Sequence, residues 1–444
     1  MTMLRVGFGQ RDITPPLGLP LGGYGARFGG ADAVLDRLHA RAIVIDDGGA
    51  AIAIVALDLV HVFADWTVRV RERITRAYGI ASERVLMAAT HTHAGPAVFR
   101  SGIERDERLA TYEHAMIEQV VASVADARQR AKPAVLRFGR AAVAEVAANR
   151  REAAMPVDHM VRVLSSHEPN GTLLGVLANF GCHPTVLSAA NHAYSGDLLG
   201  VAATQAAQTL AAPVVFTNGA AGDVSTRFTR REQTADEVQR LARLLADGVG
   251  AAVNDAVEVD LGDTSLGAAV GTVPVRWRAL PTRAAAQAEV EAALADLEAA
   301  HTRGDDARAR RVAAARVEGA QAALWVGSYG GWAVLFGERP PVAQLQALRC
   351  GDVSLVAAPG ELFSSAGTQL RHALGERVLV IGYANDYLGY FIPEAEAVAG
   401  GYEALIAMVD PRDESTICNG LVDVALAAGH LRVTSPQMER ENGL

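Results

Sequence analysis

The chain has 444 residues but only three cysteines, Cys182, Cys350 and Cys418, which stand far apart in the sequence. Cysteine-based zinc sites need closely spaced pairs, and small disulfide-rich domains need a dense set. Neither arrangement is present. The sequence therefore excludes a zinc ribbon and a disulfide framework.

Long apolar runs and an excess of basic residues are also missing. No apolar run reaches the roughly 18–20 residues that span a bilayer, and residues 1–9 lack the basic and apolar regions of a secretory signal. Lysine and arginine number 41 against 50 acidic residues, a formal net charge of −9, and aromatic residues make up only 5% of the chain. We therefore expect a cytoplasmic protein with no transmembrane segment and no nucleic-acid partner.

What is present is the composition of a large globular protein, because half of the residues are apolar and 20% are charged. Short apolar runs alternate with segments of helical periodicity, without an internal repeat or a Ser- or Pro-rich linker. This pattern predicts one compact α/β unit with insertions rather than two domains. Predicted strands cover residues 41–46, 51–59, 85–90, 135–138, 160–164, 173–180, 214–218, 352–358 and 378–384, with β-rich sequence at 264–276. Predicted helices cover residues 65–78, 108–132, 198–210, 234–253, 283–300 and 307–324.

Two segments differ from this alternation. Residues 12–30 begin with Asp12-Ile13-Thr14-Pro15, continue into a glycine-rich stretch and predict an ordered loop. Residues 283–324 are rich in alanine, are interrupted at 301–306 and predict a helical hairpin. Exposed amphipathic packing is the favoured interpretation of this hairpin, and a lid over a site is the alternative.

The predicted strand 85–90 ends in residues that can carry chemistry. It leads directly into His91-Thr92-His93 and breaks at Gly95-Pro96. Histidine binds zinc and transfers protons near neutral pH, and ligand sites form at the carboxyl ends of strands in α/β sheets. A single His-x-His pair is a weak signal, so its partners must come from elsewhere in the chain.

A similar pattern recurs at four further strand ends, where an apolar run passes directly to glycine or proline beside a polar residue. These ends are Gly181-Cys182-His183-Pro184, the 219–225 segment that ends in Ser225, Pro359-Gly360-Glu361, and the 385–390 segment that ends in Tyr390. Each has an ordinary explanation by itself, such as a turn, a helix cap or a tyrosine at the edge of the core. If the strands share a direction, two histidines, a carboxylate and a phenol converge on one pocket.

Such a convergence would suit a catalytic metal. Two histidines and a glutamate suffice to hold zinc and leave a position open for water or substrate. Zinc lowers the pKa of bound water toward neutrality and polarises a carbonyl. The loop 219–222 offers backbone N–H groups or brings Ser225 close to a reacting carbonyl. Arg150 is a candidate clamp for an anion or a carbonyl oxygen, with a solvated surface arginine as the alternative.

These segments together resemble the catalytic domain of the neutral (non-lysosomal) ceramidase family. The resemblance runs in order along nearly the whole chain, and the ordered set is specific although each motif is short. The residues that carry it are Asp12-Ile13-Thr14-Pro15, the Ala89-Thr90-His91-Thr92-His93-Ala94-Gly95-Pro96 stretch, Asn149-Arg150, His183-Pro184-Thr185, Asn191-His192, Ser195-Gly196-Asp197, Asn218, Gly222-Asp223-Val224-Ser225, Pro359-Gly360-Glu361, residues 385–390 and Gly401-Tyr402-Glu403.

The resemblance implies a fold and an activity. The fold would be a single α/β catalytic domain over residues 1–444, with mixed β-sheets flanked by helices and the hairpin at about 283–324 as an insertion. The activity would be a zinc-dependent amidohydrolase of sphingolipid or related lipid metabolism, with one zinc per chain. Its small-molecule substrate would be ceramide or another linear N-acyl amide.

The resemblance also implies residue roles. The zinc ligands carried over by position are His91, His183, Glu361 and Tyr390. His93 and Arg150 would lie beside the metal and contact the substrate carbonyl or the transition state. Ser225 matches a serine regarded as essential in the family. Whether Ser225 is a covalent nucleophile or positions the substrate beside a zinc-bound water stays open, because a zinc site makes the water route chemically sufficient.

The chain also departs from the family pattern. Family ceramidases are generally secreted or membrane-associated and carry a C-terminal immunoglobulin-like domain, which we do not expect here. Thr226 follows Ser225 where proline is usual, and Ala94 follows His93 where serine is common. We therefore expect a smaller or more polar N-acyl substrate than ceramide.

Two other functions stay open, as does assembly into a homo-oligomer. One is metal-dependent hydrolysis of an ester, lactone or phosphoester on the same scaffold. The other is a binding protein without catalysis, against which the presence of every expected ligand argues.

Overall fold

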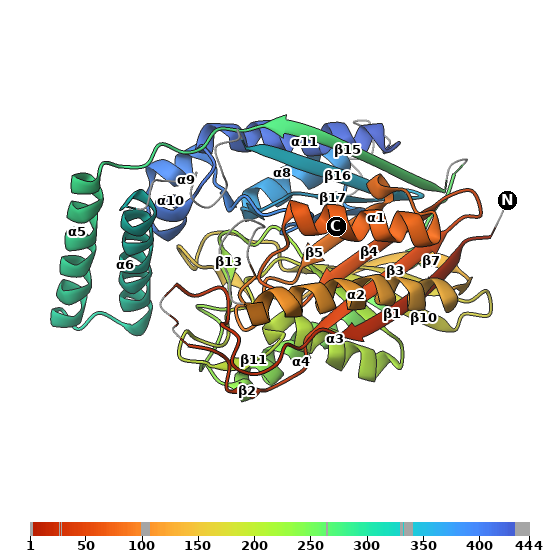
Figure 1. The fold of residues 1–444 in the computed structure, drawn as a ribbon, viewed down its shortest axis with the longest axis horizontal. Coiled ribbons are helices and arrows are strands. Elements are labelled where there is room, and N and C mark those ends of the chain that lie inside the picture. The colour runs from red at the N-terminus through yellow and green to blue at the C-terminus, as the bar shows by residue number, and fades with distance from the viewer. Residues whose placement is uncertain are drawn as a thin grey trace.

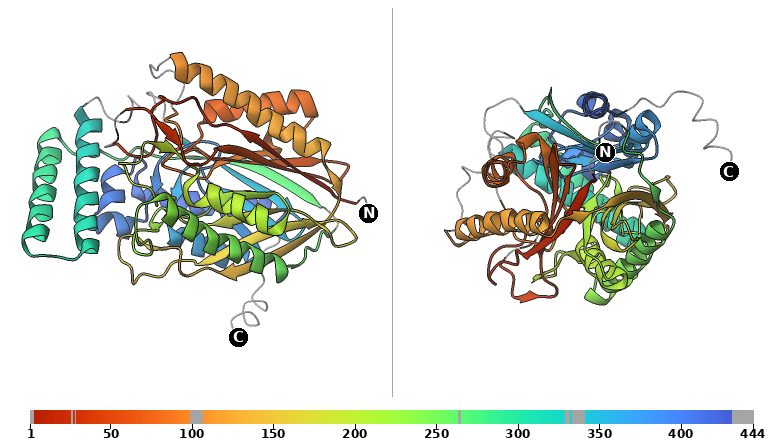
Figure 2. Two further views of the ribbon diagram at one scale, coloured as in Figure 1. Left: turned by 90° about the horizontal axis from the view of Figure 1, so that it is seen from below. Right: turned by 90° about the vertical axis from the view of Figure 1, so that its right-hand side faces the viewer.

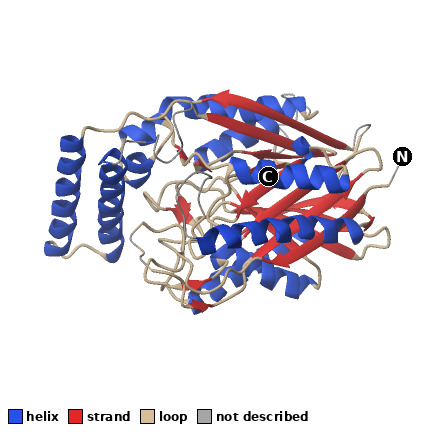
Figure 3. Cartoon of the chain, viewed as in Figure 1, coloured by secondary structure: helices blue, strands red, loops and turns tan. Residues whose placement is uncertain are grey.

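The computed structural model describes residues 3–25, 27, 29–98, 107–262, 265–328, 332 and 341–430. Ala26 and Phe28 of the predicted loop, and residue 264 at the start of the β-rich segment, lie outside these residues. The described part consists of three large β-sheets with helices on their outer faces (Figures 1 and 3). The expected α/β fold with mixed sheets flanked by helices is confirmed.

Each large sheet is mostly antiparallel but has one pair of parallel strands at one edge. The first has the order β5 (Val85–Ala89), β4 (Ala51–Leu57), β3 (His39–Asp46), β1 (Arg5–Asp12), β6 (Lys132–Pro133), with β4 and β5 parallel. The second has the order β12 (Val214–Asn218), β10 (Leu173–Phe180), β9 (Met160–His167), β7 (Val135–Ala142), β14 (Val257–Glu258), with β10 and β12 parallel. The third has the order β15 (Leu266–Pro274), β16 (Val342–Cys350), β17 (Val353–Ala357), β19 (Val378–Ile381), with β17 and β19 parallel. Parallel neighbours end at the same edge of a sheet, so each pair presents two carboxyl ends together.

Three short strand pairs and several short helices complete the loops around these edges. The pairs are β2 (Ala33–Val34) with β11 (Ala193–Tyr194), β8 (Ala148–Asn149) with β13 (Val224–Ser225), and β18 (Glu361–Leu362) with β20 (Tyr390–Phe391). The short helices are η1 (Ser82–Arg84), α9 (Glu394–Val398), α10 (Tyr402–Ile406) and η2 (Pro411–Asp413).

Two long helices cover the outer face of each large sheet (Figures 1 and 2). They are α1 (Ala64–Tyr78) and α2 (Glu107–Gln129) on the first sheet, α3 (Asp197–Leu210) and α4 (Ala235–Asn254) on the second, and α8 (Ser364–Leu374) and α11 (Glu414–Ala427) on the third. The inner faces share one apolar core, to which β3 contributes Ile43, β10 Leu177 and β17 Leu355, all fully buried. Burial of this shared surface drives the association of the three sheets.

Glycine residues allow the covering helices to lie directly on the strands. A Cβ atom at Gly9 of β1 would lie 2.0 Å from the carbonyl oxygen of Ser123 in α2. A Cβ atom at Gly139 of β7 would lie 1.9 Å from the carbonyl oxygen of Ala252 in α4. Any side chain at these positions would push the helix off its sheet.

The helical hairpin extends from one end of the molecule (Figures 1 and 2). Its two helices are α5 (Arg283–Thr302) and α6 (Ala307–Ser328), which pack on each other through Val290, Ala293 and Ala320. Leu405 of α10 packs against this small apolar cluster, so the hairpin is attached to the body through α10. None of the described helices combines the length and apolar character that crossing a membrane requires.

The predicted helices and strands are present within a few residues of their expected bounds, the hairpin included. Of the longer elements, the prediction missed β1, β16, α8 and α11, and it also missed the two-residue strands and the short helices. In β1, Gly7 and Gly9 weaken the strand signal, and both are needed for the close approach of α2. In β16, the fully buried Gln346 places an amide at a core position, where it bonds to Arg71 and Asn385.

Candidate metal centre and catalytic site

Polar residues that follow different strands lie together where the parallel strand pairs of the three sheets meet. His91 and His93 follow β5, and His183 follows β10. Glu361 begins β18 and is in register with Tyr390, the first residue of β20. The three sheets thus bring together side chains that are up to 299 positions apart in the sequence.

Asn218, the last residue of β12, fixes two of these strand ends to each other. Its side-chain amide donates hydrogen bonds to the carbonyl oxygens of Thr90 and Cys182, both at 3.1 Å. Its Oδ1 accepts the N–H of Cys182 at 3.2 Å. Because Asn218 is fully buried, these hydrogen bonds have no competition from water. The next residues are His91 and His183, so Asn218 sets the spacing of the two histidines.

Backbone carbonyl groups fix the orientation of His91 and His183. The Nδ1 of His91 lies 2.6 Å from the carbonyl oxygen of Val60, and the Nδ1 of His183 lies 2.6 Å from that of Ala221. A carbonyl oxygen only accepts, so each Nδ1 carries the proton and each Nε2 presents a lone pair. Metal-binding histidines characteristically have such a partner on the distal nitrogen.

Both Nε2 atoms face the carboxylate of Glu361. Its Oε2 lies 2.9 Å from Nε2 of His183 and 3.8 Å from Nε2 of His91. Its Oε1 accepts the hydroxyl of Tyr387 at 2.5 Å, and the hydroxyl of Tyr383 donates to Oε2 at 3.4 Å. Glu361 is thus held by phenols on one side and faces the histidines on the other.

This arrangement fits a bound cation. Burial lowers the pKa of His91 and of His183 well below the usual value, and Arg150 lowers that of His183 further. Both imidazoles are therefore neutral at neutral pH, as metal ligation requires. Their lone pairs face a carboxylate oxygen, and such acceptor atoms repel one another unless a metal ion or a proton lies among them.

His93 is supported differently from the other two histidines. Its Nε2 lies 3.2 Å from Nε2 of His91, while its buried Nδ1 has no hydrogen-bond partner among the described residues. Its ring meets the ring of Tyr24 edge-on, with centroids 4.8 Å apart. It also lies against Gly23, where an added Cβ atom would be 2.4 Å from Cγ of His93. Packing of the ring, and not a contact between Nδ1 and a carbonyl oxygen, therefore fixes the orientation of His93.

Two sets of donor atoms meet at this point. His91, His93 and His183 place one nitrogen each within 4.8 Å of one another, a group that could hold a metal ion. The set expected from the resemblance is also assembled, because the hydroxyl of Tyr390 lies 3.3 Å from Nε2 of His183 and Glu361 lies beside both. His91 and His183 belong to both sets, which differ in whether His93 or the Glu361 and Tyr390 pair completes the site.

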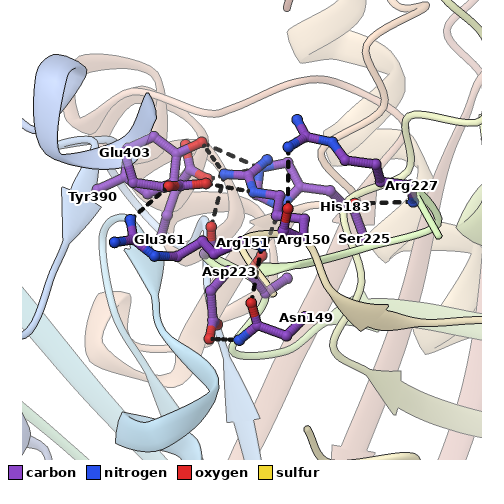
Figure 4. A network of polar contacts seen from close by, with 12 residues as sticks. Asn149, Arg150, Arg151, His183, Asp223, Ser225, Arg227, Glu361, Tyr390 and Glu403 are labelled. Atoms are coloured by element: carbon purple, nitrogen blue, oxygen red, sulfur yellow. Dashed lines mark hydrogen bonds and ion pairs between the residues drawn. The ribbon is translucent and has the colours of Figure 1, made fainter. Parts of the chain in front are cut away.

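Arg150 lies beside His183 in a buried polar network (Figure 4). Its Nε lies 2.7 Å from Oε1 of Glu403, and its Nη2 donates to the hydroxyl of Tyr390 at 2.8 Å and to the carbonyl of Gly222 at 2.7 Å. Burial alone would lower its pKa, but Tyr390, Glu403 and Glu361 together raise the pKa well above the usual value. The guanidinium is therefore a fixed positive charge and not the solvated surface arginine considered as the alternative.

Asp223 holds the segment that carries Arg150 (Figure 4). Its carboxylate accepts the side-chain amide of Asn149 at 2.8 Å and both the N–H and the hydroxyl of Ser364 at 2.7 Å. Its carbonyl oxygen accepts the N–H of Arg150 at 2.7 Å. Three separate segments are thus joined at one carboxylate.

Ser225 is buried at the end of β13, and its backbone is paired with that of His183. Its Oγ accepts the N–H of Arg227 at 3.1 Å. Among the described residues, no imidazole and no carboxylate is hydrogen-bonded to this oxygen. A serine nucleophile needs such a base, so the geometry provides Ser225 with no activating partner.

A cavity of about 410 Å³ lies in front of these side chains. His93, Arg150, Ser225 and Tyr390 line it, together with residues of α6 in the hairpin. The volume is that of a small-ligand pocket. The helical hairpin is therefore part of the wall of the site and not only an exposed packing element.

Comparison with known families agrees with these features. Residues 4–236, more than half of the chain, match the family model described as neutral/alkaline non-lysosomal ceramidase, N-terminal. The chain belongs to this family. The resemblance inferred from the motifs is confirmed.

Two curated members of the ceramidase family are similar over a shorter stretch. The neutral ceramidase of Pseudomonas aeruginosa is 29% identical over 220 residues, which are 45% of this chain and 32% of the relative. The neutral ceramidase of Mycobacterium tuberculosis is 28% identical over 229 residues, which are 45% of this chain and 35% of the relative. The matched region thus spans about a third of the length of these relatives.

Two solved structures are similar over nearly the whole chain. A ceramidase complexed with C2 has a TM-score of 0.77 at 21% identity, over 98% of this chain and 77% of that one. The crystal structure of the Pseudomonas aeruginosa neutral ceramidase has a TM-score of 0.74 at 23% identity, over 98% of this chain and 76% of that one. At this level of identity the likeness establishes a shared fold.

Sequence reasoning missed several residues that complete the ceramidase-like site. The sequence motifs give no role to Tyr383 or Tyr387, yet both hydroxyls donate to the carboxylate of Glu361. A signal was available, because Tyr383, Tyr387 and Tyr390 follow one strand at intervals of four and three residues. The Gly401-Tyr402-Glu403 motif includes Glu403 but did not predict that this residue pairs with Arg150.

Proposed function

We propose that this chain is a zinc-dependent hydrolase of a linear N-acyl amide, either ceramide-like or smaller. The observation that carries the proposal is the neutral pair His91 and His183 facing Glu361, with the fixed charge of Arg150 beside them. The names of the curated relatives support an amide as the bond that is cleaved. The three sheets would act as one catalytic domain, with α5 and α6 as an insertion.

One zinc per chain would be held by His91, His183, Glu361 and Tyr390. Zinc bound there would lower the pKa of a water molecule and polarise the substrate carbonyl. Burial raises the pKa of Tyr390 well above the usual value, so without a cation its phenol keeps its proton. In that state the hydroxyl donates to Nε2 of His183 and accepts from Arg150, as the observed distances allow.

Arg150 and His93 would act on the substrate. The guanidinium of Arg150 is held by Glu403 and Tyr390, so it needs no reorganisation to stabilise negative charge on a carbonyl oxygen. His93 lines the cavity beside His91 and would hold or transfer a proton at the reacting atoms.

Ser225 would position the substrate rather than attack it. Its hydroxyl lines the cavity, and the N–H of Arg227 orients its oxygen. The absence of a hydrogen-bonded base among the described residues favours this role over covalent catalysis.

A substrate screen with metal analysis tests the proposal. N-acyl amides, esters and phosphoesters that share one acyl group are incubated with the purified protein, before and after chelation and after re-addition of zinc. We expect about one zinc per chain, amide hydrolysis that disappears on chelation, and recovery on adding zinc.

Other outcomes would point elsewhere. Cleavage of esters or phosphoesters in marked preference to amides would identify the alternative hydrolase. Full zinc occupancy without turnover of any substrate would identify a binding protein.

A further inference from the structure

The cavity in front of the metal centre is strongly basic. Besides Arg150, three arginines line it: Arg227 and Arg230 on the segment after β13, and Arg311 on α6. One acidic residue, Glu318 of α6, is among the lining residues, and it is exposed. Arginines thus outnumber carboxylates in the lining of the cavity.

The three arginines donate hydrogen bonds to uncharged oxygens. Nη1 of Arg227 donates to the carbonyl of Arg150 at 3.1 Å, and Nη1 of Arg311 donates to the carbonyl of Arg227 at 2.7 Å. Nη1 of Arg230 donates to the carbonyl of Thr185, and its buried Nε has no hydrogen-bond partner among the described residues. Each guanidinium carries five N–H groups, and the described residues accept only a few of them.

Two neighbouring arginines are paired with carboxylates. Arg150 pairs with Glu403, and Arg151 pairs with Glu396 and Glu403. Within the described part of the chain, no carboxylate forms an ion pair with Arg227, Arg230 or Arg311. The three side chains are half-buried. A partly buried charge without a close counter-ion favours a ligand of opposite charge.

Burial also makes the charged form of two of these arginines less favourable. It lowers the pKa of Arg227 to about 10, with Arg150 as a further cause, and it lowers the pKa of Arg230. Both guanidinium groups stay protonated at neutral pH. An anion in the cavity would stabilise all three charges at once.

The rest of the lining argues against a long hydrocarbon chain. Its apolar members are alanines and tyrosines, and no leucine, isoleucine, valine, phenylalanine or methionine is among the described lining residues. A volume of about 410 Å³ accommodates a small molecule. Both properties suit a compact polar substrate.

We infer that the substrate is a small N-acyl amide with an anionic group, a carboxylate or a phosphate, bound by Arg227, Arg230 and Arg311 while its amide lies at the metal centre. This inference rests on the proposed amide hydrolase activity and specifies its substrate class. Arg311 lies on α6, so the helical hairpin supplies one of the three cations that would bind the anionic group. The hairpin would thus contribute directly to substrate specificity.

Three substrates with the same acyl chain test the inference on the zinc-loaded protein. N-hexanoylglycine carries a carboxylate, N-hexanoyl-O-phosphoethanolamine carries a phosphate, and N-hexanoylethanolamine is neutral. We expect kcat/KM for at least one anionic substrate to exceed that for the neutral one about tenfold or more, and the ratio to fall as salt concentration rises. The preferred anionic substrate distinguishes carboxylate from phosphate recognition.

Substitutions in α6 separate charge from packing. Arg311→Gln should reduce the anionic-to-neutral ratio about tenfold, and Arg311→Lys should restore part of it. Arg230→Gln should act in the same direction. Arg310→Gln removes the same charge from the neighbouring residue of α6, which does not line the cavity, and should leave the ratio unchanged.

Equal kcat/KM for charged and neutral substrates, or a ratio that Arg311→Gln and Arg230→Gln do not alter, would overturn the inference. Calorimetric binding of N-hexanoylglycine and N-hexanoylethanolamine to the same protein provides a readout that does not depend on turnover. If no substrate is cleaved but the anionic compound binds selectively, the proposed function fails while the basic cavity is confirmed as an anion site. Equal or absent binding of both compounds rejects the anion site.

Discussion

His183 and Glu361 face each other across 2.9 Å with two acceptor atoms, Nε2 and Oε2. The carbonyl of Ala221 holds the proton of His183 on Nδ1, which leaves Nε2 as a lone pair. The three-sheet core fixes both residues, so they cannot separate without distorting the strand ends that carry them. This pair is the strongest structural argument for a cation at the site.

Glu361→Gln should remove zinc while the fold is retained. Glutamine has nearly the same shape as glutamate but no charge, so the site loses the negative charge that offsets the metal. Zinc content after dialysis should fall from about one per chain to below about 0.1. Atomic emission of the dialysed protein measures the metal, and circular dichroism confirms the fold. Glu394→Gln, an exposed substitution, serves as the control, and retention of a full zinc by Glu361→Gln would contradict the ligand assignment.

Gly23→Ala should impair activity without removing zinc. The new Cβ would lie 2.4 Å from Cγ of His93, and Gly23 has a φ of +93°, so the ring or the loop must move. We expect kcat/KM to fall about tenfold or more, because a small displacement of a catalytic group has a large effect on rate. Steady-state kinetics and metal analysis on the same sample measure both properties.

Gly25→Ala is a matched control, since nothing lies within 4 Å of a Cβ at that position. It should have little effect on either property. If Gly23→Ala loses zinc together with activity, His93 is a ligand, and the three-histidine set replaces the set with Glu361 and Tyr390.

Glu403→Gln should destabilise the protein strongly. Glu403 is buried and pairs with both Arg150 and Arg151, so its neutralisation leaves a buried guanidinium without its counter-ion. Removing one partner of a buried pair costs about 3–5 kcal/mol. Urea denaturation measures the free energy of unfolding. Glu396→Gln removes a more exposed partner of Arg151 alone and should cost less than about 1 kcal/mol, so equal effects of the two substitutions would argue against the network.

Asp36 should cause the free energy of unfolding to decrease as the pH rises from about 4 to about 6. Burial raises its pKa to about 6, hydrogen bonds from Ser195 and Gly196 oppose that shift, and Asp58 and Asp197 add to it. The folded state therefore binds more protons than the unfolded state in this window, and the stabilisation present at lower pH is lost as pH rises. The effect is at most about 3 kcal/mol and is reduced by solvent, because Asp36 is partly exposed.

Asp36→Asn should remove this part of the pH dependence. Relative to the unmodified protein, the variant should gain stability as pH rises from about 4 to about 6, and the difference should then stay constant. Urea denaturation across this range measures it, with the exposed Asp32→Asn as the control. A constant difference at all pH values would show that the pKa of Asp36 is not raised.

The sequence was informative where local signals and the tertiary fold agree. Val85 to Ala89 is a continuous apolar run, and Leu173 to Phe180 is apolar apart from Asn179, because most of both strands is buried on both faces. Polar residues follow where each strand ends. The hairpin was visible from its alanine-rich periodicity. Gln346 hid β16, because a buried amide satisfied by Arg71 and Asn385 has the appearance of a surface residue.

The sequence by itself determined the α/β class, the main strands and helices, and the strand ends that carry His91, His183, Glu361 and Tyr390. Hydrophobic periodicity and the polar residues at strand ends are local patterns. They can therefore be recognised from residues that are adjacent in the sequence. Only the tertiary structure decided that Glu361 faces His183, that Glu403 holds Arg150, and that α6 brings Arg311 into the same cavity as Ser225. These contacts join residues from 86 to 253 positions apart, and they arise from the packing of three sheets on one core, which no local pattern records.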